Sequence, residues 1–350
     1  MKSTRQIFIN ILFASFVISF LSTCVKKDSG PIQNNWETIY QNNDLYLYSI
    51  KFLDKDHGFV MADSDCIHGP SNWKYVLTTS DGGKNWNMVN CTTYDTVEWL
   101  PLYDIGFIYP ISQNVLLTTG YRVHKSIDGG RTWIDLSPQF IGSTINDLHV
   151  IDSITWIVAA GLNIYRTDNG GQSWETVFHT DSDLVFSRLS FPTKEVGYAS
   201  IGRTDPDHFL TIGHILKTFD GGQSWHFLNS EPWKSSNIEM PDIYSLQFLS
   251  DLFGYIKTYD YKLYRTIDGG NNWNLVNDNI KTNGLQYFIT QNAGYCSDGV
   301  TIYVTNDGGK AWKADYYNNA AESDILAWTF LETGEGYALT RDHRIIKNNF

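Results

Sequence analysis

The segment TIDGGNNW, Thr266 to Trp273, decides the fold because the chain repeats it. The further copies are TSDGGKNW (79–86), SIDGGRTW (126–133), TDNGGQSW (167–174), TFDGGQSW (218–225) and TNDGGKAW (305–312). Successive copies start 47, 41, 51, 48 and 39 residues apart. A reactive centre is normally built once, so a segment used six times at this period indicates the structural unit of a repeat protein.

The residues between the copies form short runs of alternating apolar and polar side chains, rich in Val, Ile, Tyr, Phe and Thr. Such runs predict β-strands. In the fifth unit we predict strands at residues 243–248, 254–258, 262–266 and 273–276. Four antiparallel strands in a unit of this length predict one blade of a β-propeller.

Seven blades are expected although there are six copies, because a second strand can be placed seven times. Its predicted starts are Gly58, Asn114, Thr155, Gly197, Gly254, Gly294 and Gly336. The last unit ends in RIIKNNF (344–350), where a copy should follow, and NNWETIY (34–40) begins with the Trp position that elsewhere follows the copy. We therefore predict an all-β, seven-bladed propeller over residues 34–350, with about 28 strands, in which the N-terminal strand completes the last blade.

The repeated segment, which we call the box, is predicted to be the hairpin between the third and fourth strands of a blade. Its Ser or Thr and its Asp can hydrogen-bond the turn, its glycines can adopt positive φ, and its Trp can pack against the next blade. A phosphate-binding glycine loop would need a following helix, and a calcium loop would need carboxylates at alternating positions. The predicted structural residues are Asp81, Trp86, Asp128, Trp133, Asn169, Trp174, Asp220, Trp225, Asp268, Trp273, Asp307 and Trp312.

The N-terminus is predicted to be an export signal over residues 1–23. Lys2 and Arg5 precede an apolar run, 7–21, that is too short to span a bilayer stably. The following LSTC resembles the lipobox of bacterial lipoproteins, which implies lipidation of Cys24 and a polar tether over 24–33; plain secretion and an uncleaved anchor are the alternatives. We expect a membrane-anchored lipoprotein on the periplasmic or cell-surface side of the envelope.

Charge and cysteines restrict the partners. Without Lys2 and Arg5 the chain has 24 basic and 38 acidic residues, a net charge of −14, which argues against nucleic acid and anionic lipid as partners. The membrane is therefore expected to hold the protein through the lipid anchor only. Cys66 and Cys91 flank the first box and could pair in an oxidising compartment. No cofactor motif or metal-ligand spacing is present, so no cofactor is expected.

The boxes resemble a known repeat. The pattern [ST]-x-D-x-G-x-x-W is similar to the Asp-box, or BNR, repeat of sialidases, xyloglucanases and sortilin-type receptors. The longer forms NIYRTDNGGQSW (163–174), HILKTFDGGQSW (214–225) and KLYRTIDGGNNW (262–273), with a basic residue before Thr, resemble the photosystem II assembly and stability factor family. The resemblance covers residues 34–350.

This resemblance implies a single seven-bladed propeller with a non-enzymatic assembly or scaffold role. Because many members come from organisms without a photosystem, it does not name the partner. Sialidases carry an R-I-P phrase that this chain lacks, and xyloglucanases use two propellers where this chain has room for one. We therefore expect no enzymatic activity; a divergent glycoside hydrolase is the enzymatic alternative.

Function is expected on the face away from the boxes, where the longest predicted loops lie, at 63–73, 90–101, 203–213 and 229–242. Exposed functional residues concentrate on such loops. Their rings could anchor a protein or peptide, stack on a glycan, or fold back over their own loops. The candidate partner- or ligand-binding residues are Trp73, Tyr94, Trp99, Arg203 and Trp233.

The central channel is the second candidate site. Alternate residues of each innermost strand are predicted to line it, since side chains alternate along a strand. The candidate channel cluster is Lys51, Asp104, Asp147, His149 and Arg188. It could be an acid–base cluster, an anion site, or a set of charges that neutralise one another in a water-filled hole.

The leading hypothesis is thus an exported, lipid-anchored propeller that binds a protein or peptide as an assembly scaffold of the envelope. A carbohydrate-binding module or divergent glycosidase is the alternative, and a purely structural envelope protein is the third hypothesis.

Overall fold

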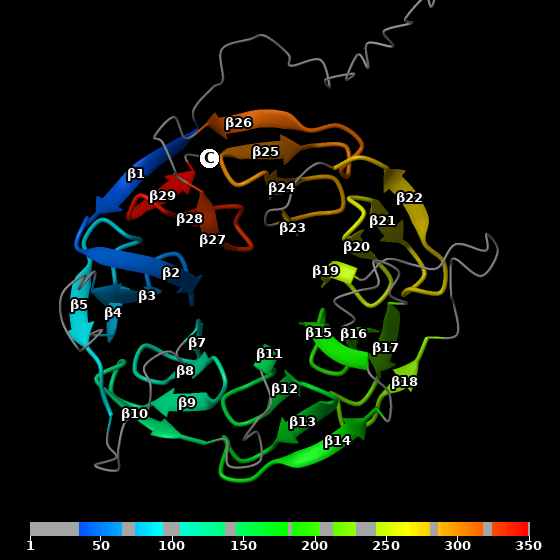
Figure 1. The fold of residues 1–350 in the computed structure, drawn as a ribbon, viewed down its shortest axis with the longest axis horizontal. Coiled ribbons are helices and arrows are strands. Elements are labelled where there is room, and N and C mark those ends of the chain that lie inside the picture. The colour runs from blue at the N-terminus through cyan, green and yellow to red at the C-terminus, as the bar shows by residue number, and fades with distance from the viewer. Residues whose placement is uncertain are drawn as a thin grey trace, which may run out of the picture. The chain divides into compact units, whose positions relative to one another are not determined.

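The computed structural model describes residues 35–64, 74–93, 106–136, 145–180, 184–203, 213–228, 243–280, 286–317 and 324–348. All described residues belong to one compact unit, which spans Ile32–Phe350. In this unit seven sheets form a ring, with β2, β7, β11, β15, β19, β23 and β27 innermost (Figure 1). The predicted all-β, seven-bladed propeller is confirmed.

Each blade is a four-stranded antiparallel sheet whose first strand is innermost and whose fourth strand is outermost. Blade 1 is β2 (Leu45–Phe52), β3 (Gly58–Ser64), β4 (Lys74–Thr79) and β5 (Asn87–Asn90). Blade 2 is β7 (Phe107–Pro110), β8 (Leu116–Thr119), β9 (Val123–Ser126) and β10 (Thr132–Asp135). Blade 3 is β11 (Ile145–Val150), β12 (Trp156–Ala160), β13 (Asn163–Thr167) and β14 (Glu175–His179). Blade 4 is β15 (Leu184–Ser190), β16 (Gly197–Arg203), β17 (His214–Thr218) and β18 (His226–Phe227).

The remaining blades follow the same order. Blade 5 is β19 (Ile243–Phe248), β20 (Gly254–Thr258), β21 (Leu263–Thr266) and β22 (Asn274–Asn277), within one residue of every strand boundary predicted for this unit. Blade 6 is β23 (Gln286–Phe288), β24 (Gly294–Ser297), β25 (Thr301–Thr305) and β26 (Lys313–Tyr317). Blade 7 is β27 (Ile325–Phe330), β28 (Gly336–Thr340), β29 (Arg344–Asn348) and β1 (Trp36–Gln41).

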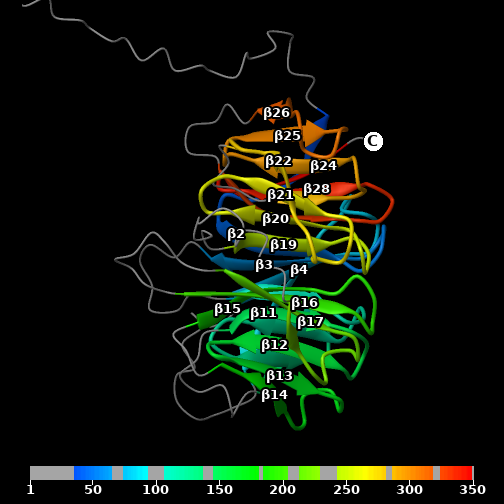
Figure 2. The ribbon, with the colours of Figure 1, turned by 90° about the vertical axis from the view of Figure 1, so that its right-hand side faces the viewer.

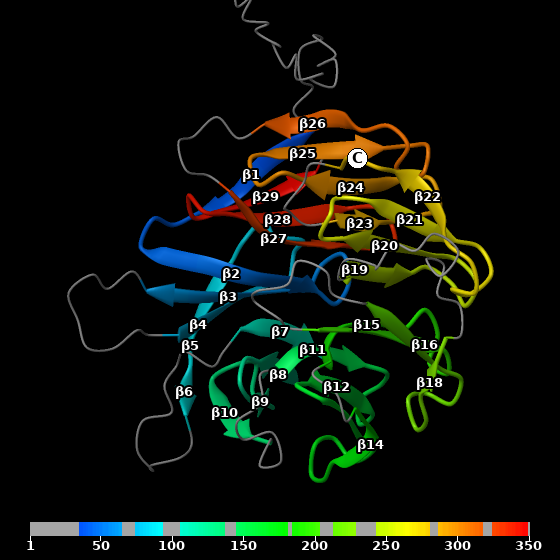
Figure 3. The same cartoon turned by 45° about the vertical axis from the view of Figure 1, so that its right-hand side comes forward.

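The N-terminal strand closes the ring. β1 pairs antiparallel with β29, from Trp36 opposite Asn348 to Gln41 opposite Arg344, and Figure 3 shows the two strands side by side. The Trp36 indole is 4% exposed, packs edge-on to Phe330, and donates a 3.0 Å hydrogen bond from Nε1 to Asp315 Oδ2. Trp36 therefore takes the place of a box Trp in the blade that has no box.

One short strand was not predicted. β6 (Thr92–Thr93) pairs in parallel with β10, so the chain leaving blade 1 adds an edge strand to blade 2. Just before it, Cys91 is buried between these blades and is not in a disulfide. The possible pairing of Cys91 with Cys66 stays a prediction, because Cys66 lies outside the described residues. A buried thiol that packs as a small apolar side chain explains Cys91 without a bridge.

The core lies between the blades. Each of seven buried clusters combines residues of two adjacent blades, including one that joins blade 7 to blade 1. Trp273 of blade 5 packs in the cluster that contains Tyr198 and Ile215 of blade 4. The box Trp thus faces the preceding blade, whereas the sequence predicted the next one.

Strands run along the axis of the ring, so every blade presents its two ends to opposite faces (Figure 2). One face, the box face, carries the boxes and the turns between the first and second strands. The other, the opposite face, carries the turns between the second and third strands and the connections between blades.

Candidate functional site

The box is a closed hydrogen-bonded turn. In blade 5, Thr266 Oγ1 donates to Asp268 Oδ1 (2.8 Å) and accepts from the Gly270 amide (2.9 Å), while Asp268 Oδ1 also accepts from the Asn272 amide (2.8 Å). Gly270 has φ +86°, and a Cβ there would lie 2.8 Å from Leu228 Cδ1 of blade 4. Glycine is therefore required by backbone conformation and by space.

The box carboxylates are poor proton donors. In the first box, hydrogen bonds from the Asn85 side chain and amide lower the pKa of Asp81 to about 2. The third box has Asn169, whose Oδ1 accepts from Thr167 Oγ1 (2.9 Å) and from the Ser173 amide (2.9 Å) in the same geometry. An amide replaces the acid without changing the turn, so the turn needs an acceptor oxygen and not a titrating group.

At the box face, a basic residue and a tyrosine of one blade form hydrogen bonds to the next blade. Lys217, two residues before Phe219, donates from Nζ to the Asp251 carbonyl of blade 5 (3.4 Å). The ring of Tyr198 stacks on Phe248 at 3.4 Å, and its hydroxyl donates to the same Asp251 carbonyl (2.7 Å). The basic residue that recurs before the box therefore contacts the next blade.

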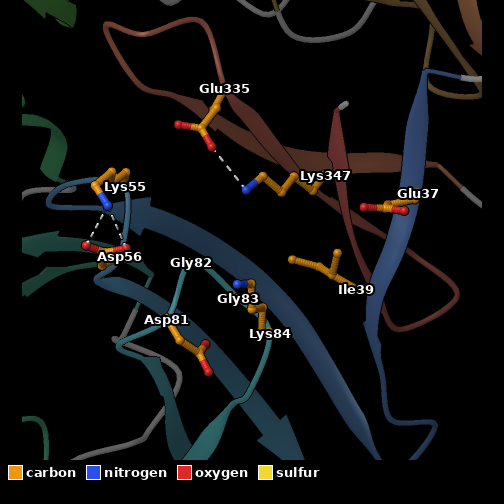
Figure 4. Close-up of a pocket in the computed structure, with 10 residues that line it drawn as sticks. All are labelled: Glu37, Ile39, Lys55, Asp56, Asp81, Gly82, Gly83, Lys84, Glu335 and Lys347. Atoms are coloured by element: carbon orange, nitrogen blue, oxygen red, sulfur yellow. Dashed lines mark hydrogen bonds and ion pairs between the residues drawn. The ribbon is translucent and has the colours of Figure 1, made fainter. Parts of the chain in front are cut away.

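A pocket of about 280 Å³ lies at the seam between blades 7 and 1 (Figure 4). It contains lysines and carboxylates from both blades, and two of its ion pairs join Lys347 to Glu335 and Lys55 to Asp56, each at 3.1 Å. Opposite charges that already pair with each other leave little net charge to select a ligand. The described ranges hold no group of three or more His, Cys, Asp and Glu suited to a metal ion.

The predicted channel cluster is only partly brought together. Lys51 lies on β2, Asp147 and His149 on β11, and Arg188 on β15; Asp104 lies outside the described residues. Asp147 and His149 pair across the sheet with Ala159 and Ile157, which belong to the core between blades 3 and 4. Their side chains therefore lie on the sheet face toward blade 4.

Hydrogen bonds and burial constrain the chemistry of these groups. The two Asp147 oxygens accept from the amides of Leu148 (2.9 Å) and Leu189 (2.8 Å), and burial raises the pKa of Asp147. The His149 ring stacks on Phe191 at 4.6 Å, and burial, followed by the charge of Lys51, lowers its pKa to about 4. His149 is therefore neutral at neutral pH.

The Lys51 side chain is exposed at the inner edge of blade 1. The surrounding protein reduces the hydration of its ammonium group, and this lowers the pKa of Lys51. Sequence reasoning missed Tyr109 on β7, whose pKa is raised by burial and then by Asp147. In blade 5, Gln247 exchanges two hydrogen bonds of 2.8 Å with the backbone of Phe288. Asp147 and Gln247 thus both join their own innermost strand to that of the next blade.

The opposite face carries a second set of exposed rings that the sequence did not single out. They sit at strand ends and in short turns and are 39 to 60% exposed: Tyr46, Phe107, Tyr121, Tyr259, Tyr261 and Tyr317. The sequence gives no signal for them, because nothing in the alternation of residues shows which turn side chains remain uncovered. We call this set the aromatic face set.

Two turns of the opposite face hold ring side chains in a left-handed backbone conformation. Tyr261 and His343 both have φ +66°, rare outside glycine and Asn. The Tyr261 amide donates to the Thr258 carbonyl (3.0 Å), and the His343 ring packs against Tyr46 at a tilt of 56°, with the ring centroids 4.9 Å apart. Such conformations persist where the surroundings enforce them, and they are common at binding sites.

The loop residues predicted from the sequence mostly lie outside the described residues. These are Trp73, Tyr94, Trp99 and Trp233, and Cys24 of the expected anchor lies there too. Arg203 ends β16 at the opposite face. No described helix is long and apolar enough to cross a bilayer.

Comparison with known proteins agrees with the repeats. The family described as "Photosynthesis system II assembly factor YCF48" matches residues 29–182. "Photosystem II assembly lipoprotein Ycf48" of Synechococcus sp. (strain CC9902) is 30% identical over 122 residues, 32% of this chain and 34% of that protein. Its namesake in Prochlorococcus marinus is 24% identical over 93% of this chain and 91% of its own length. "Photosystem II stability/assembly factor HCF136, chloroplastic" of Arabidopsis thaliana is 20% identical over 96% and 85%.

Solved structures show the same fold. "YCF48 bound to D1 peptide" has a TM-score of 0.65 at 17% identity and covers 91% of this chain and 97% of its own. "YCF48 from Cyanidioschyzon merolae" has a TM-score of 0.62 at 18% identity, covering 89% and 98%. The GH74 xyloglucanase of Xanthomonas campestris reaches 0.56 at 12% identity and covers 87% of this chain but 59% of the enzyme.

Proposed function

We propose, from the premise that this chain is an Asp-box β-propeller similar to the photosystem II assembly factors, that it is a lipid-anchored, non-enzymatic scaffold of the envelope. It binds a segment of a partner protein on the opposite face. The aromatic face set carries the proposal, because exposed Tyr and Phe side chains on a rigid frame are effective anchors for peptides.

The frame around these rings is rigid. Tyr259 packs edge-on against Tyr244 at 5.2 Å, and the turn that carries it is closed by a hydrogen bond from the Thr258 amide to the Lys262 carbonyl (3.0 Å). Rings held in place lose little conformational entropy on binding, so more of their contact energy becomes affinity. Trp73, Tyr94, Trp99, Arg203 and Trp233, on the longer loops of this face, are proposed to extend the same surface.

A relative supports a polypeptide as the ligand. One similar propeller of known structure is "YCF48 bound to D1 peptide". The acidic charge of this chain argues in addition against nucleic acid. The partner is therefore proposed to be a polypeptide segment, and its sequence is not specified by the fold.

Affinity capture from detergent-solubilised membranes tests the proposal. We expect the full chain to recover a defined protein that the Tyr121→Ser/Tyr259→Ser variant recovers much less well. A Phe227→Ser/Leu275→Ser variant, altered at exposed positions of the outer strands, should recover it as the unaltered chain does. Equal recovery by both variants would remove the opposite face from the proposal, and binding to a glycan array in place of protein would favour the carbohydrate alternative.

The anchor has a separate test. Cys24→Ala should release the chain from the membrane fraction and lower its mass by the lipid. An unchanged fractionation and mass would exclude lipidation at this residue.

A further inference from the structure

The box face carries exposed apolar side chains at the tips of its turns. They are 53 to 68% exposed and contain no hydroxyl: Ile127, Ile154, Phe219, Leu252 and Ile267. Three of them occupy the second position of a box, and the other two occupy turns between first and second strands. We call this set the apolar arc.

The apolar arc is confined to four consecutive blades. Blade 2 contributes Ile127, blade 3 Ile154, blade 4 Phe219, and blade 5 both Leu252 and Ile267. At the same positions, blades 1 and 6 carry only polar residues, namely Asp56, Ser80, Asn292 and Asn306, and blades 2, 3 and 4 each carry one polar residue beside their apolar one, namely Asn114, Asp168 and Glu195. Scattered single apolar residues are normal on a surface, but a grouping on one side of one face indicates a contact.

Hydrogen bonds hold these tips in place. The Ile154 carbonyl accepts from the Gly170 amide (2.8 Å), and the Leu252 carbonyl accepts from the Gly269 amide (2.8 Å). Lys217 joins adjacent members, because its Nζ lies 4.8 Å from the Phe219 ring and bonds to the carbonyl next to Leu252. The side chains therefore project from a stiff surface and do not collapse onto it.

The N-terminal strand begins at this same face. Trp36 pairs with Asn348, the last residue of β29, at the position where a box joins the other blades. Eleven residues, 25 to 35, separate it from Cys24, and an extended chain of that length reaches about 36 to 40 Å. A lipid on Cys24 would therefore be joined to the domain through a strand that begins at the box face, on blade 7.

We propose that the box face is the membrane-facing side of the propeller, with the apolar arc inserted into the lipid headgroup region. This rests on the lipid anchor of the proposed function. Apolar tips that bury a few ångströms deep add a second, weaker contact to a single lipid anchor, which alone holds a protein reversibly. The opposite face then points away from the bilayer, where a partner can reach it.

The acidic net charge of the chain determines which kind of contact with the membrane is favourable. Without Lys2 and Arg5 the chain has a net charge of −14 and is not attracted to anionic headgroups, so insertion depends on apolar burial. The strength of membrane binding should accordingly change little when phosphatidylglycerol is replaced by phosphatidylcholine.

Depth-dependent fluorescence quenching tests this orientation. The lipidated full chain, with Cys66→Ser so that the label is directed to the introduced cysteine, carries a bimane on Phe219→Cys in vesicles of phosphatidylcholine with brominated acyl chains. The matched controls are Phe227→Cys, on the outer strand of the same blade, and Tyr259→Cys, on the opposite face. We expect the Phe219 site to be quenched about fivefold more strongly than both controls, since interfacial side chains reach about 5 to 10 Å into the boundary of the acyl chains.

Each outcome decides the proposal. Equal quenching at the three sites would overturn it, and so would a chain that does not associate with the vesicles at all. An Ile267→Cys label repeats the test if Phe219→Cys fails to fold. A dimer that an Ile127→Ser/Phe219→Ser variant converts to a monomer would identify a second copy as the occupant and would also overturn it. Capture of a protein partner through the opposite face is measured separately, so the two proposals can fail independently.

Discussion

The two faces of the propeller differ in how regular their turns are. On the box face the same hydrogen bonds recur from blade to blade: a Ser or Thr hydroxyl bonds to the second box glycine at 2.8 to 3.0 Å in all six boxes. On the opposite face the described turns differ in length and conformation, and two of them hold Tyr261 and His343 at positive φ. Repetition therefore fixes the frame, and variation at the other end of the same strands provides surfaces that can recognise a partner.

The largest effect should come from a box tryptophan. Trp273→Ala removes a side chain that is 9% exposed and packs edge-on to Phe248 at 5.9 Å, and we expect a loss of about 3 to 5 kcal/mol in unfolding free energy. Urea titration measures this loss, and partner capture by the remaining folded protein should be unchanged. Phe227→Ala, a control on the preceding blade that is 46% exposed and packs edge-on to Phe178 and His214, should cost only about 1 kcal/mol. A loss at Trp273 no larger than at Phe227 would mean that the box does not stabilise the blades.

Removing the box hydroxyl should cost less. Thr266→Val leaves the Gly270 amide and Asp268 without the Thr266 hydroxyl, with an expected loss of about 1 to 3 kcal/mol. The control is Thr176→Val on the exposed side of β14. Equal urea midpoints for the two variants would contradict a stabilising role for this hydrogen bond.

Acid should weaken the junction of blades 3 and 4 through His149. Its folded pKa of about 4 lies below the ordinary value of 6.5, so the unfolded chain binds the proton first and stability falls as pH drops from 6.5 to 4. We expect a loss of roughly 1 to 2 kcal/mol after solvent screening of a half-buried ring. His149→Gln should flatten this part of the curve.

The raised pKa of Asp147 contributes with the opposite sign, because the unfolded carboxyl loses its proton first as pH rises. Asp147 is present in both proteins and cancels in the difference between their curves. Parallel stability curves for the unaltered chain and His149→Gln over this range would show that the imidazole does not titrate with folding.

The smallest effect is expected at the one box with an amide. Asn169→Asp should change stability by less than about 0.5 kcal/mol, because in blade 4 Ser224 Oγ donates to Asp220 Oδ2 at 2.6 Å, and Ser173 can do the same for an aspartate. Differential scanning calorimetry measures the shift in Tm. A large shift of either sign would show that the third box is specialised.

Much of the fold followed from the boxes, since they marked the third and fourth strands of six blades. Blade 5 agrees to within one residue, and the closing strand was predicted from the Trp36 position. The features that the sequence did not predict depend on how adjacent blades pack against each other. That Trp273 faces the preceding blade, and that Asp147 bonds to Leu189 of the next one, follows from the packing of sheets around a ring and not from alternation along a strand.

The candidate site was less predictable. The sequence singled out the long loops by their length. Their residues Trp73, Tyr94, Trp99 and Trp233 remain proposed partner-binding residues. Tyr121 and Tyr259 lie in short turns, where only the exposed fraction of each ring, 58% and 60%, separates a surface anchor from a core residue.

Site-specific photo-cross-linking tests the central claim, that the opposite face binds a polypeptide, most directly. p-Benzoylphenylalanine is placed at Tyr259 or at Phe219 in the full, membrane-bound chain, and the adducts are identified by mass spectrometry after irradiation of intact cells. We expect a discrete polypeptide adduct from Tyr259 and none from Phe219. A polypeptide adduct from Phe219 with none from Tyr259 would contradict it.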